Sequence, residues 1–96
     1  MLTWVVYDIS NDQTRNRVAR QCLDFGLYRV QKSVFLGDVA ANRVEEIVLF
    51  SRRLLDPATD AVYVFPMCRE DFDKVRIVGL GFDRELVADK VLTKVI

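Results

Sequence analysis

The sequence predicts an α+β domain in which two helices cover one face of an antiparallel sheet. Three observations support this prediction. The chain begins with an apolar run over residues 2–9, two later segments repeat apolar residues at helical spacing, and a second strongly apolar run covers residues 60–67. With 96 residues, of which 51% are hydrophobic, the chain has the length of one domain with a single core.

The first predicted element is a strand over residues 2–9, because Val, Trp and Tyr favour strands. This strand brings a carboxylate, Asp8, to its end, and a polar turn over residues 10–12 follows. A carboxylate at the carboxyl end of a buried strand is held rigidly and still reaches solvent, so Asp8 is a candidate site residue. The alternative is that Asp8 only caps the turn or helix that follows, and the spacing alone favours that structural role.

Apolar residues at helical spacing predict a first helix over residues 13–25, with Asn11 or Asp12 as its cap and Gly26 as its end. Arg15 falls on the apolar side of this helix, one turn before the other residues of that side. Its guanidinium is therefore expected near the end of the first strand.

Residues 28–37 alternate and are rich in strand-forming side chains, so they predict either one bent strand or a tight hairpin. A second amphipathic helix is predicted over residues 39–55, with Asp38 as its cap and the Asp-Pro pair at 56–57 as its stop. The apolar run over residues 60–67 predicts the next strand.

The last part of the chain is less regular. Residues 75–78 are a weaker strand candidate, and the tail over residues 83–96 fits either a short helix or a strand that ends at 92–96. The order of the stronger elements is that of a ferredoxin-like βαββαβ sandwich. We therefore expect a core domain over residues 1–81 and a C-terminal extension over residues 82–96.

Both faces of the first predicted strand are apolar, and so are both faces of residues 62–65. A two-layer monomer would have polar residues on its uncovered face, so a further layer is expected. The simplest further layer is the same sheet of another protomer, packed face to face by twofold symmetry. In such a homodimer two copies of Asp8 would meet, and they could bind a divalent cation or share a proton.

The composition excludes several kinds of chemistry. The chain has no histidine, which removes Ser-His or Cys-His nucleophile pairs and His-ligated zinc. An enzyme of this composition would use carboxylates, Tyr, Lys or Arg, together with a hard cation such as Mg²⁺ or Mn²⁺. Cys22 and Cys68 match no metal-ligand spacing and are expected as small core residues in a reducing compartment. Because no apolar run approaches the roughly 20 residues that a bilayer requires, we expect a soluble cytoplasmic protein without a membrane partner.

The formal net charge is zero, but residues 13–43 contain six basic residues and only two acids. This arginine-rich third could present a phosphate-binding face, although charge alone favours an ordinary solvated helix face. Arg15 and Arg17 could bind phosphate with forked donors or could pair within the helix. Arg29 and Lys32 could follow a nucleic-acid backbone or could protect a sheet edge from aggregation.

Three segments taken together resemble a known family. Residues 7–10, 15–19 and 26–37, which include the runs YDIS and RVQKSVF, resemble the small subunit of the CRISPR adaptation machinery. This CRISPR-associated family is often called Cas-two and is described as an endoribonuclease. The resemblance is dense over residues 2–37, includes residues 60–68 and fades in the C-terminal tail.

The resemblance implies a ferredoxin-like fold, a homodimer with facing sheets, and an additional C-terminal strand that pads the sheet edge of the partner protomer. It implies that Asp8 from each protomer is the catalytic and metal-binding acid, with Mg²⁺ or Mn²⁺ as the cofactor. The resemblance also implies roles for five other residues. Nucleic-acid binding is implied for Arg15, Arg17 and Arg29, and a supporting role for Tyr7 and Phe35.

The resemblance also implies a role in spacer acquisition beside the integrase subunit, which inserts new spacers into the CRISPR array. Two activities remain open. The protein could be a metal-dependent endonuclease that hydrolyses single-stranded RNA or DNA, or a non-catalytic dimeric scaffold that holds duplex DNA for the integrase. One carboxylate per chain is compatible with either activity. A third hypothesis is a toxin-like mRNA interferase on the same fold.

Overall fold

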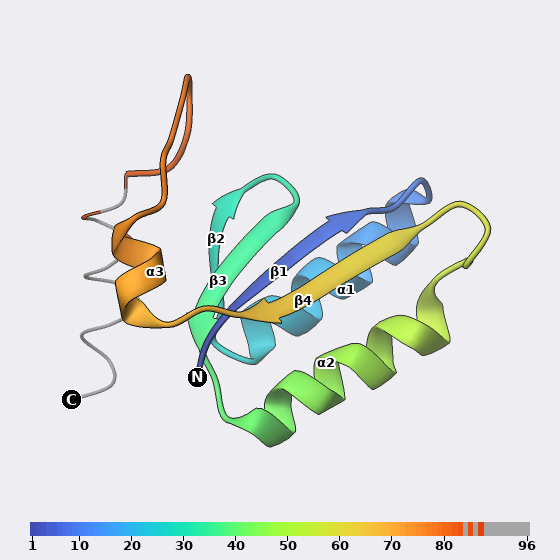
Figure 1. The fold of residues 1–96 in the computed structure, drawn as a ribbon. Coiled ribbons are helices and arrows are strands. Elements are labelled where there is room, and N and C mark those ends of the chain that lie inside the picture. The colour runs from blue at the N-terminus through green and yellow to red at the C-terminus, as the bar shows by residue number, and fades with distance from the viewer. Residues whose placement is uncertain (84, 86, 88–96) are drawn as a thin grey trace.

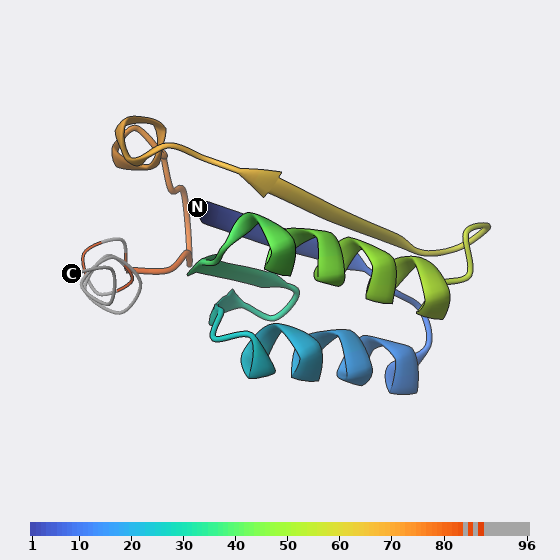
Figure 2. The same cartoon turned by 90° about the horizontal axis from the view of Figure 1, so that it is seen from below.

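The computed structural model describes residues 1–83, 85 and 87. The elements follow one another as β1 (Leu2–Asp8), α1 (Asp12–Asp24), β2 (Tyr28–Gln31), β3 (Val34–Asp38), α2 (Ala41–Leu54), β4 (Ala61–Pro66) and α3 (Arg69–Asp73). The strands form one four-stranded antiparallel sheet in the order β2-β3-β1-β4. Helices α1 and α2 lie side by side on one face of this sheet (Figure 1 and Figure 2). The predicted α+β fold and its βαββαβ order are confirmed.

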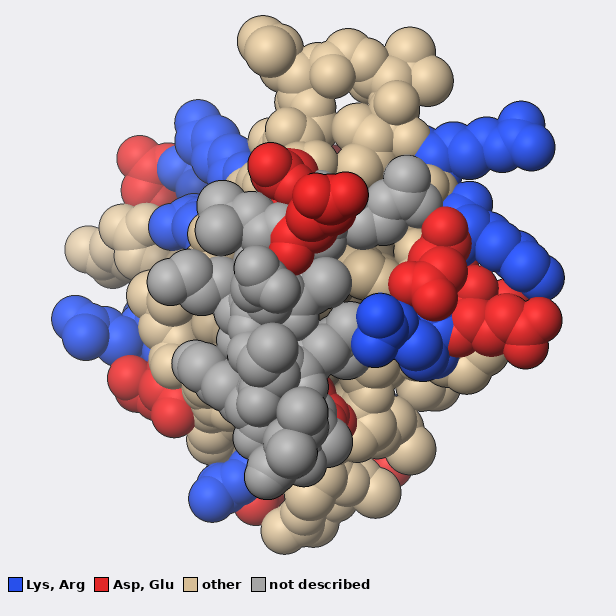
Figure 3. All heavy atoms as spheres, turned by 90° about the vertical axis from the view of Figure 1, so that its left-hand side faces the viewer, with Lys and Arg blue, Asp and Glu red and all other residues tan. Residues whose placement is uncertain are grey.

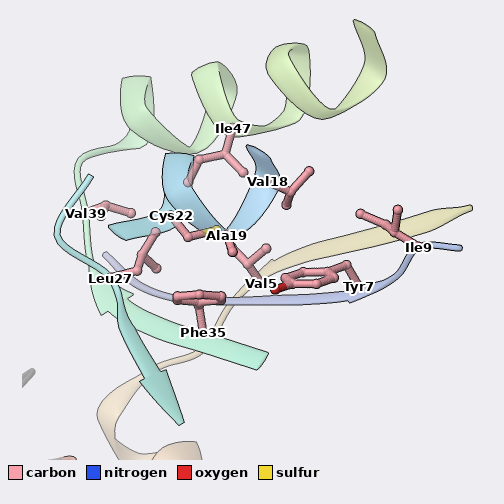
Figure 4. Packing of buried hydrophobic residues seen from close by; sticks show 10 residues of the cluster. All are labelled: Val5, Tyr7, Ile9, Val18, Ala19, Cys22, Leu27, Phe35, Val39 and Ile47. Atoms are coloured by element: carbon pink, nitrogen blue, oxygen red, sulfur yellow. The ribbon is translucent and has the colours of Figure 1, made fainter. Parts of the chain in front are cut away.

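Strand β1 lies in the middle of the sheet, and its side chains alternate between the two faces. Val5 and Tyr7 point toward the helices, where they join the main core (Figure 4). Trp4 lies on the opposite face in a second cluster. The main core contains ten buried side chains, namely Val5, Tyr7, Ile9, Val18, Ala19, Cys22, Leu27, Phe35, Val39 and Ile47.

Helix α1 begins and ends within one residue of the predicted bounds, 13 and 25. The side chain of Asn11 caps the helix by accepting a hydrogen bond from the backbone N–H of Thr14 at 3.0 Å. After the C-cap residue Phe25, Gly26 adopts a φ of +84°, which a residue with a side chain rarely adopts. Glycine is therefore needed at this position to turn the chain toward β2.

Helix α2 differs from the prediction at its start. Asp38 is not its cap, because Asp38 ends β3 and its carboxylate pairs with the N-terminal amine of Met1. The N-cap is Ala40, which makes no side-chain hydrogen bond. The predicted stop is confirmed, since the helix ends at Leu54, ahead of the Asp-Pro pair at 56–57.

Residues 28–37 form a tight hairpin, one of the two predicted alternatives. Its turn consists of only Lys32 and Ser33, and the pairing of β2 with β3 shifts between Arg29 and Gln31 at a β-bulge. The bulge allows the short edge strand β2 to twist against β3.

The chain itself covers one end of the sheet face that α1 and α2 leave open. The ring of Trp4 lies 6.3 Å from that of Phe72 in α3 and 5.7 Å from that of Phe82. Val87 is buried in the same cluster. Part of the expected further layer is therefore supplied by the same chain, whereas Tyr63 and Phe65 on the same face stay exposed among the described residues.

Several weaker predictions fail or fall outside the described chain. Residues 75–78 form no strand, and α3 occupies a segment for which the sequence predicted no helix. The predicted strand at 92–96 lies outside the described residues. Cys22 is buried as expected, whereas the prediction for Cys68 is wrong because this residue is exposed. Among the helices described, none is long and apolar enough to span a membrane.

Candidate functional site

Asp8 ends β1 on the open face of the sheet. It pairs with Ala61 of β4, two positions beyond the pair of Val6 and Tyr63, and therefore on the same face. Its side chain is exposed, and within the described residues no hydrogen bond or ion pair engages its carboxylate. The residue is therefore held by a central strand while its carboxylate oxygens face solvent.

The loop after Asp8 is held in place by Asp60, a residue that is distant in the sequence. The carboxylate of Asp60 accepts a hydrogen bond from the backbone N–H of Ser10 at 3.1 Å and another from the N–H of Asp56 at 3.2 Å. These bonds lower the pKa of Asp60, with the bond from Ser10 as the largest cause. Asp60 thus ties the loop before β4 to the loop between β1 and α1.

Arg15 lies where the helical pattern placed it, beside the end of β1. One terminal nitrogen, Nη1, donates to the backbone oxygen of Ile9 at 3.1 Å, and the other, Nη2, pairs with the carboxylate of Asp12. Arg15 therefore stiffens the connection between β1 and α1. Arg17 is exposed on the first half of the same helix, so its guanidinium is open to a ligand.

Tyr7, Phe35 and Arg29 form a second group at this end of the sheet. The rings of Tyr7 and Phe35 stack at 6.2 Å between centroids, and the Arg29 guanidinium lies 5.3 Å from the centroid of Phe35. Figure 4 shows the two rings side by side beneath the helices. The Tyr7 hydroxyl donates to the backbone oxygen of Lys32 at 3.4 Å. Two nitrogens of Arg29 donate to the same oxygen, Nε at 3.1 Å and Nη2 at 2.7 Å.

The ionisation of Tyr7 reflects this environment. Burial raises the pKa of the Tyr7 phenol, while the positive charges of Arg29 and Arg15 act in the opposite direction. The phenol is therefore neutral at physiological pH and can donate its proton to the Lys32 carbonyl.

The sheet separates the predicted site residues into two groups. Asp8 lies on the open face, whereas Tyr7 and Phe35 lie on the helix face. Arg29 pairs with Phe35 across β2 and β3, so it also belongs to the helix face. The acid and the aromatic group are thus neighbours along the chain that point to opposite sides of the sheet.

The prediction from sequence missed Asp60 as a residue that supports the site. The signal was weak, because an acid between a Pro-containing turn and a strand is also common in ordinary loops. Only the position of Asp60 opposite Ser10 reveals its role.

Strand β4 is an edge of the sheet, and a groove runs between it and α2. Exposed aromatic surface lies next to this groove, since Tyr63 keeps 61% of its surface accessible. The groove is lined by Val48, Ser51, Arg52, Leu55, Pro57, Asp60, Ala61, Val62, Tyr63 and Val64.

The sequence profile of a family described as CRISPR associated protein Cas2 matches residues 1–75 of this chain. The CRISPR-associated endoribonuclease Cas2 of Desulforudis audaxviator is 41% identical over 87 residues, which cover 88% of this chain and 82% of the relative. The CRISPR-associated endoribonuclease Cas2 1 of Archaeoglobus fulgidus is 38% identical over 90 residues, which cover 94% of this chain and 95% of the relative.

Solved structures have the same fold. The crystal structure of Streptococcus pyogenes Cas2 at pH 6.5 superposes with a TM-score of 0.70 and 26% identity, covering 82% of this chain and all 100% of that one. A hypothetical protein from Thermus thermophilus superposes with a TM-score of 0.68 and 34% identity, covering 83% of this chain and 92% of that one.

Proposed function

The chain belongs to the CRISPR associated protein Cas2 family, and we propose that it is a metal-dependent endonuclease that hydrolyses phosphodiester bonds in single-stranded RNA, in DNA or in both. Its biological role in this proposal is spacer acquisition in the cytoplasm, beside the CRISPR integrase subunit. The observation that supports the activity is the exposed carboxylate of Asp8 at the end of the central strand. The names of the relatives, CRISPR-associated endoribonucleases, agree with it.

The proposed cofactor is Mg²⁺ or Mn²⁺, held by Asp8. Carboxylate oxygens are the ligands that such hard cations prefer, and Asp8 offers them to solvent. Among the residues described, no three potential ligands of one chain gather at one point. A twofold dimer would bring a second Asp8 to the ion. When bound, the ion supplies polarisation of the phosphoryl oxygen and a water of lowered pKa.

Arginines of α1 would help to bind and orient the nucleic acid. Arg17 is exposed in the first half of α1, where a planar guanidinium can make paired hydrogen bonds to a phosphate. Arg15 donates to the backbone oxygen of Ile9 and so holds the connection between β1 and the helix that carries Arg17. Backbone N–H groups at the start of a helix add a favourable field for the phosphate charge.

The proposed homodimer would cover the remaining apolar surface of the open face. Val6 is half-buried, and its neighbour Tyr63 on β4 is exposed. The apolar groove beside the edge strand β4 could receive a further strand, and we assign this role to the extension over residues 82–96 of the partner protomer. Two residues of that extension, Phe82 and Val87, pack against their own chain, so the contact with the partner would be made by later residues.

The proposal is tested by the substitution Asp8→Asn in a cleavage assay with labelled single-stranded RNA and DNA and added Mg²⁺. Because a bound metal ion contributes several kcal/mol to stabilisation of the transition state, the rate should fall by about 100-fold or more. Asp24→Asn is the matched control, since Asp24 is exposed at the far end of α1. Cleavage by Asp8→Asn at the rate of the unchanged protein would disprove the nuclease.

The second candidate function is a non-catalytic scaffold that binds duplex DNA for the integrase subunit. It is favoured by the separation of the acid from the basic and aromatic group, because Asp8 and Arg29 lie on opposite faces of the sheet. A scaffold would bind duplex DNA with little sequence preference and with an affinity that falls steeply with salt. It would also keep spacer acquisition in the Asp8→Asn variant, which the nuclease would lose.

A further inference from the structure

We propose that Lys32 contacts the phosphate of the nucleic acid at the Asp8 site, and that Tyr7 and Arg29 are positioning residues that hold Lys32 in place. This inference rests on the proposed function, because it concerns the ligand of the same site. It assigns Arg29 to a role different from the direct nucleic-acid contact that the sequence predicted.

The turn of the hairpin places Lys32 near the end of β1. The last regular pair of β1 and β3 joins Val6 to Val34. The backbone N–H of Tyr7 then donates to the oxygen of Ser33 at 3.1 Å, which holds the turn against the residue that precedes Asp8. Lys32 is the other residue of this turn, and its backbone oxygen accepts a hydrogen bond from the Tyr7 hydroxyl at 3.4 Å. The end of β1 that carries Asp8 and the turn that carries Lys32 are therefore neighbours.

The turn that presents Lys32 is held by three donors on one oxygen. Arg29 contributes Nε at 3.1 Å and Nη2 at 2.7 Å, and the Tyr7 hydroxyl contributes the longer bond at 3.4 Å. Arg29 is itself placed by the ring of Phe35, which stacks on Tyr7. A two-residue turn fixed in this way loses little freedom when a ligand binds, which strengthens binding through pre-organisation.

The charge of Lys32 suits a phosphate. Its side chain is exposed, and it makes no ion pair within the described chain. An ammonium group is a compact charge that can approach a non-bridging phosphate oxygen from several directions. Beside the carboxylate of Asp8, it would attract the anionic backbone that a carboxylate alone repels.

Lys74 provides a matched comparison at the other end of the molecule. It belongs to the α3 region, far from the connection between β1 and α1 (Figure 1 and Figure 2), and it pairs with Glu70 at 3.4 Å. Among the described residues on this end, Figure 3 shows acidic and basic side chains close together. Removing the charge of Lys74 changes the net charge by the same amount without touching the proposed site.

The first experiment compares Lys32→Gln, Lys32→Arg and Lys74→Gln in binding to a single-stranded RNA oligonucleotide at several salt concentrations. If Lys32 neutralises one phosphate, Lys32→Gln should weaken binding several-fold and reduce the slope of log K against log salt by about 0.7. Lys32→Arg should restore the slope, and Lys74→Gln should leave it unchanged. Equal slopes for Lys32→Gln and Lys74→Gln would overturn the inference.

The second experiment tests whether Arg29 acts through Lys32. Arg29→Lys removes the fork that holds the Lys32 carbonyl and should weaken binding in the otherwise unchanged protein. In the Lys32→Gln background the same substitution should have no further effect, since the residue being positioned is gone. If the losses of affinity caused by the two substitutions add up in the double variant, Arg29 contacts the nucleic acid itself. That result would refute its positioning role.

The two proposals can fail separately. Binding measurements do not need cleavage, so the role of Lys32 is decided even if the protein cuts nothing. If Asp8→Asn cuts normally while Lys32→Gln loses affinity, the nuclease fails and the phosphate contact stands. If Asp8→Asn is inactive while Lys32→Gln binds normally, the nuclease stands and the role of Lys32 fails.

Discussion

The carboxylate of Asp60 accepts the backbone N–H of Ser10 at 3.1 Å, which joins the loop before β4 to the loop that follows Asp8. This bond is the largest of the causes that lower the pKa of Asp60 below its usual 3.8. A carboxyl group with a lowered pKa in the folded state stabilises the fold above its unfolded pKa. That contribution is lost as the pH falls through the folded pKa.

Asp60→Asn should therefore lower the melting temperature at pH 7 and should reduce the further loss of stability as the pH falls below the pKa of an unperturbed Asp, about 3.9. The measurement is thermal unfolding followed by circular dichroism across this pH range. Asp24→Asn, an exposed carboxylate at the end of α1, serves as control. Parallel curves for Asp60→Asn and the unchanged protein would show that the bond to Ser10 does not stabilise the fold.

Phe72→Ala should destabilise the protein by about 3–5 kcal/mol, because it removes a ring that is 1% exposed and packs on Trp4. Trp4 is the single tryptophan of the chain, so its fluorescence reports directly on this contact. The measurement is urea unfolding followed by that fluorescence. Val78→Ala is the control, since Val78 is 97% exposed, and it should change stability by no more than about 0.5 kcal/mol. A change below about 1 kcal/mol for Phe72→Ala would mean that α3 does not dock on the sheet.

The two thiols should differ in reactivity. Burial raises the pKa of the Cys22 thiol to about 12, so almost no thiolate exists at pH 8. Cys68 is exposed at the start of α3. A colorimetric disulfide reagent should therefore titrate one thiol rapidly in the native protein and both after denaturation. Rapid reaction of both thiols in the native state would contradict the burial of Cys22 between α1 and the sheet.

If two copies of Asp8 form one metal site, cleavage should depend on association. The rate per chain should rise with protein concentration until the dimer is saturated, because the monomer supplies only half of the ligands. Excess Asp8→Asn protein added to the active protein should reduce cleavage by forming mixed dimers. A rate per chain that stays constant down to concentrations where sedimentation shows monomers would contradict a shared site.

Much of the fold could be predicted from the sequence because its periodic signals are strong. Strand β1 is a short apolar run of strand-forming residues followed by a polar turn, and α1 has both an Asn cap and a closing glycine. The hairpin was harder, since Lys32 and Ser33 lack the Asn-Gly or Asp-Gly signal of a two-residue turn. Helix α3 was missed because five residues of mostly charged sequence are too few to show a helical period.

At the site too, features set by residues close in sequence could be predicted, and features set by residues distant in sequence could not. The exposure of Asp8 and the proximity of Arg15 to the end of β1 follow from alternation and from the helical wheel, which are local. The role of Asp60 depends on a pairing across the sheet, 50 positions from Ser10 in sequence. The bonds of Arg29 to Lys32 form next to the β-bulge in β2, and no short sequence pattern reveals them.

Tyr7 and Asp8 are adjacent in the chain and lie on opposite faces of the sheet. Inserting or deleting one residue within β1 would exchange their faces, placing a carboxylate against Phe35 in the core and a phenol in solvent. Substitutions in β1 would each change one contact, whereas a change in its length would abolish both the core and the site. Over evolution, this strand should vary in side chains far more readily than in length, and comparison of its relatives should show gaps in the loops and not in β1.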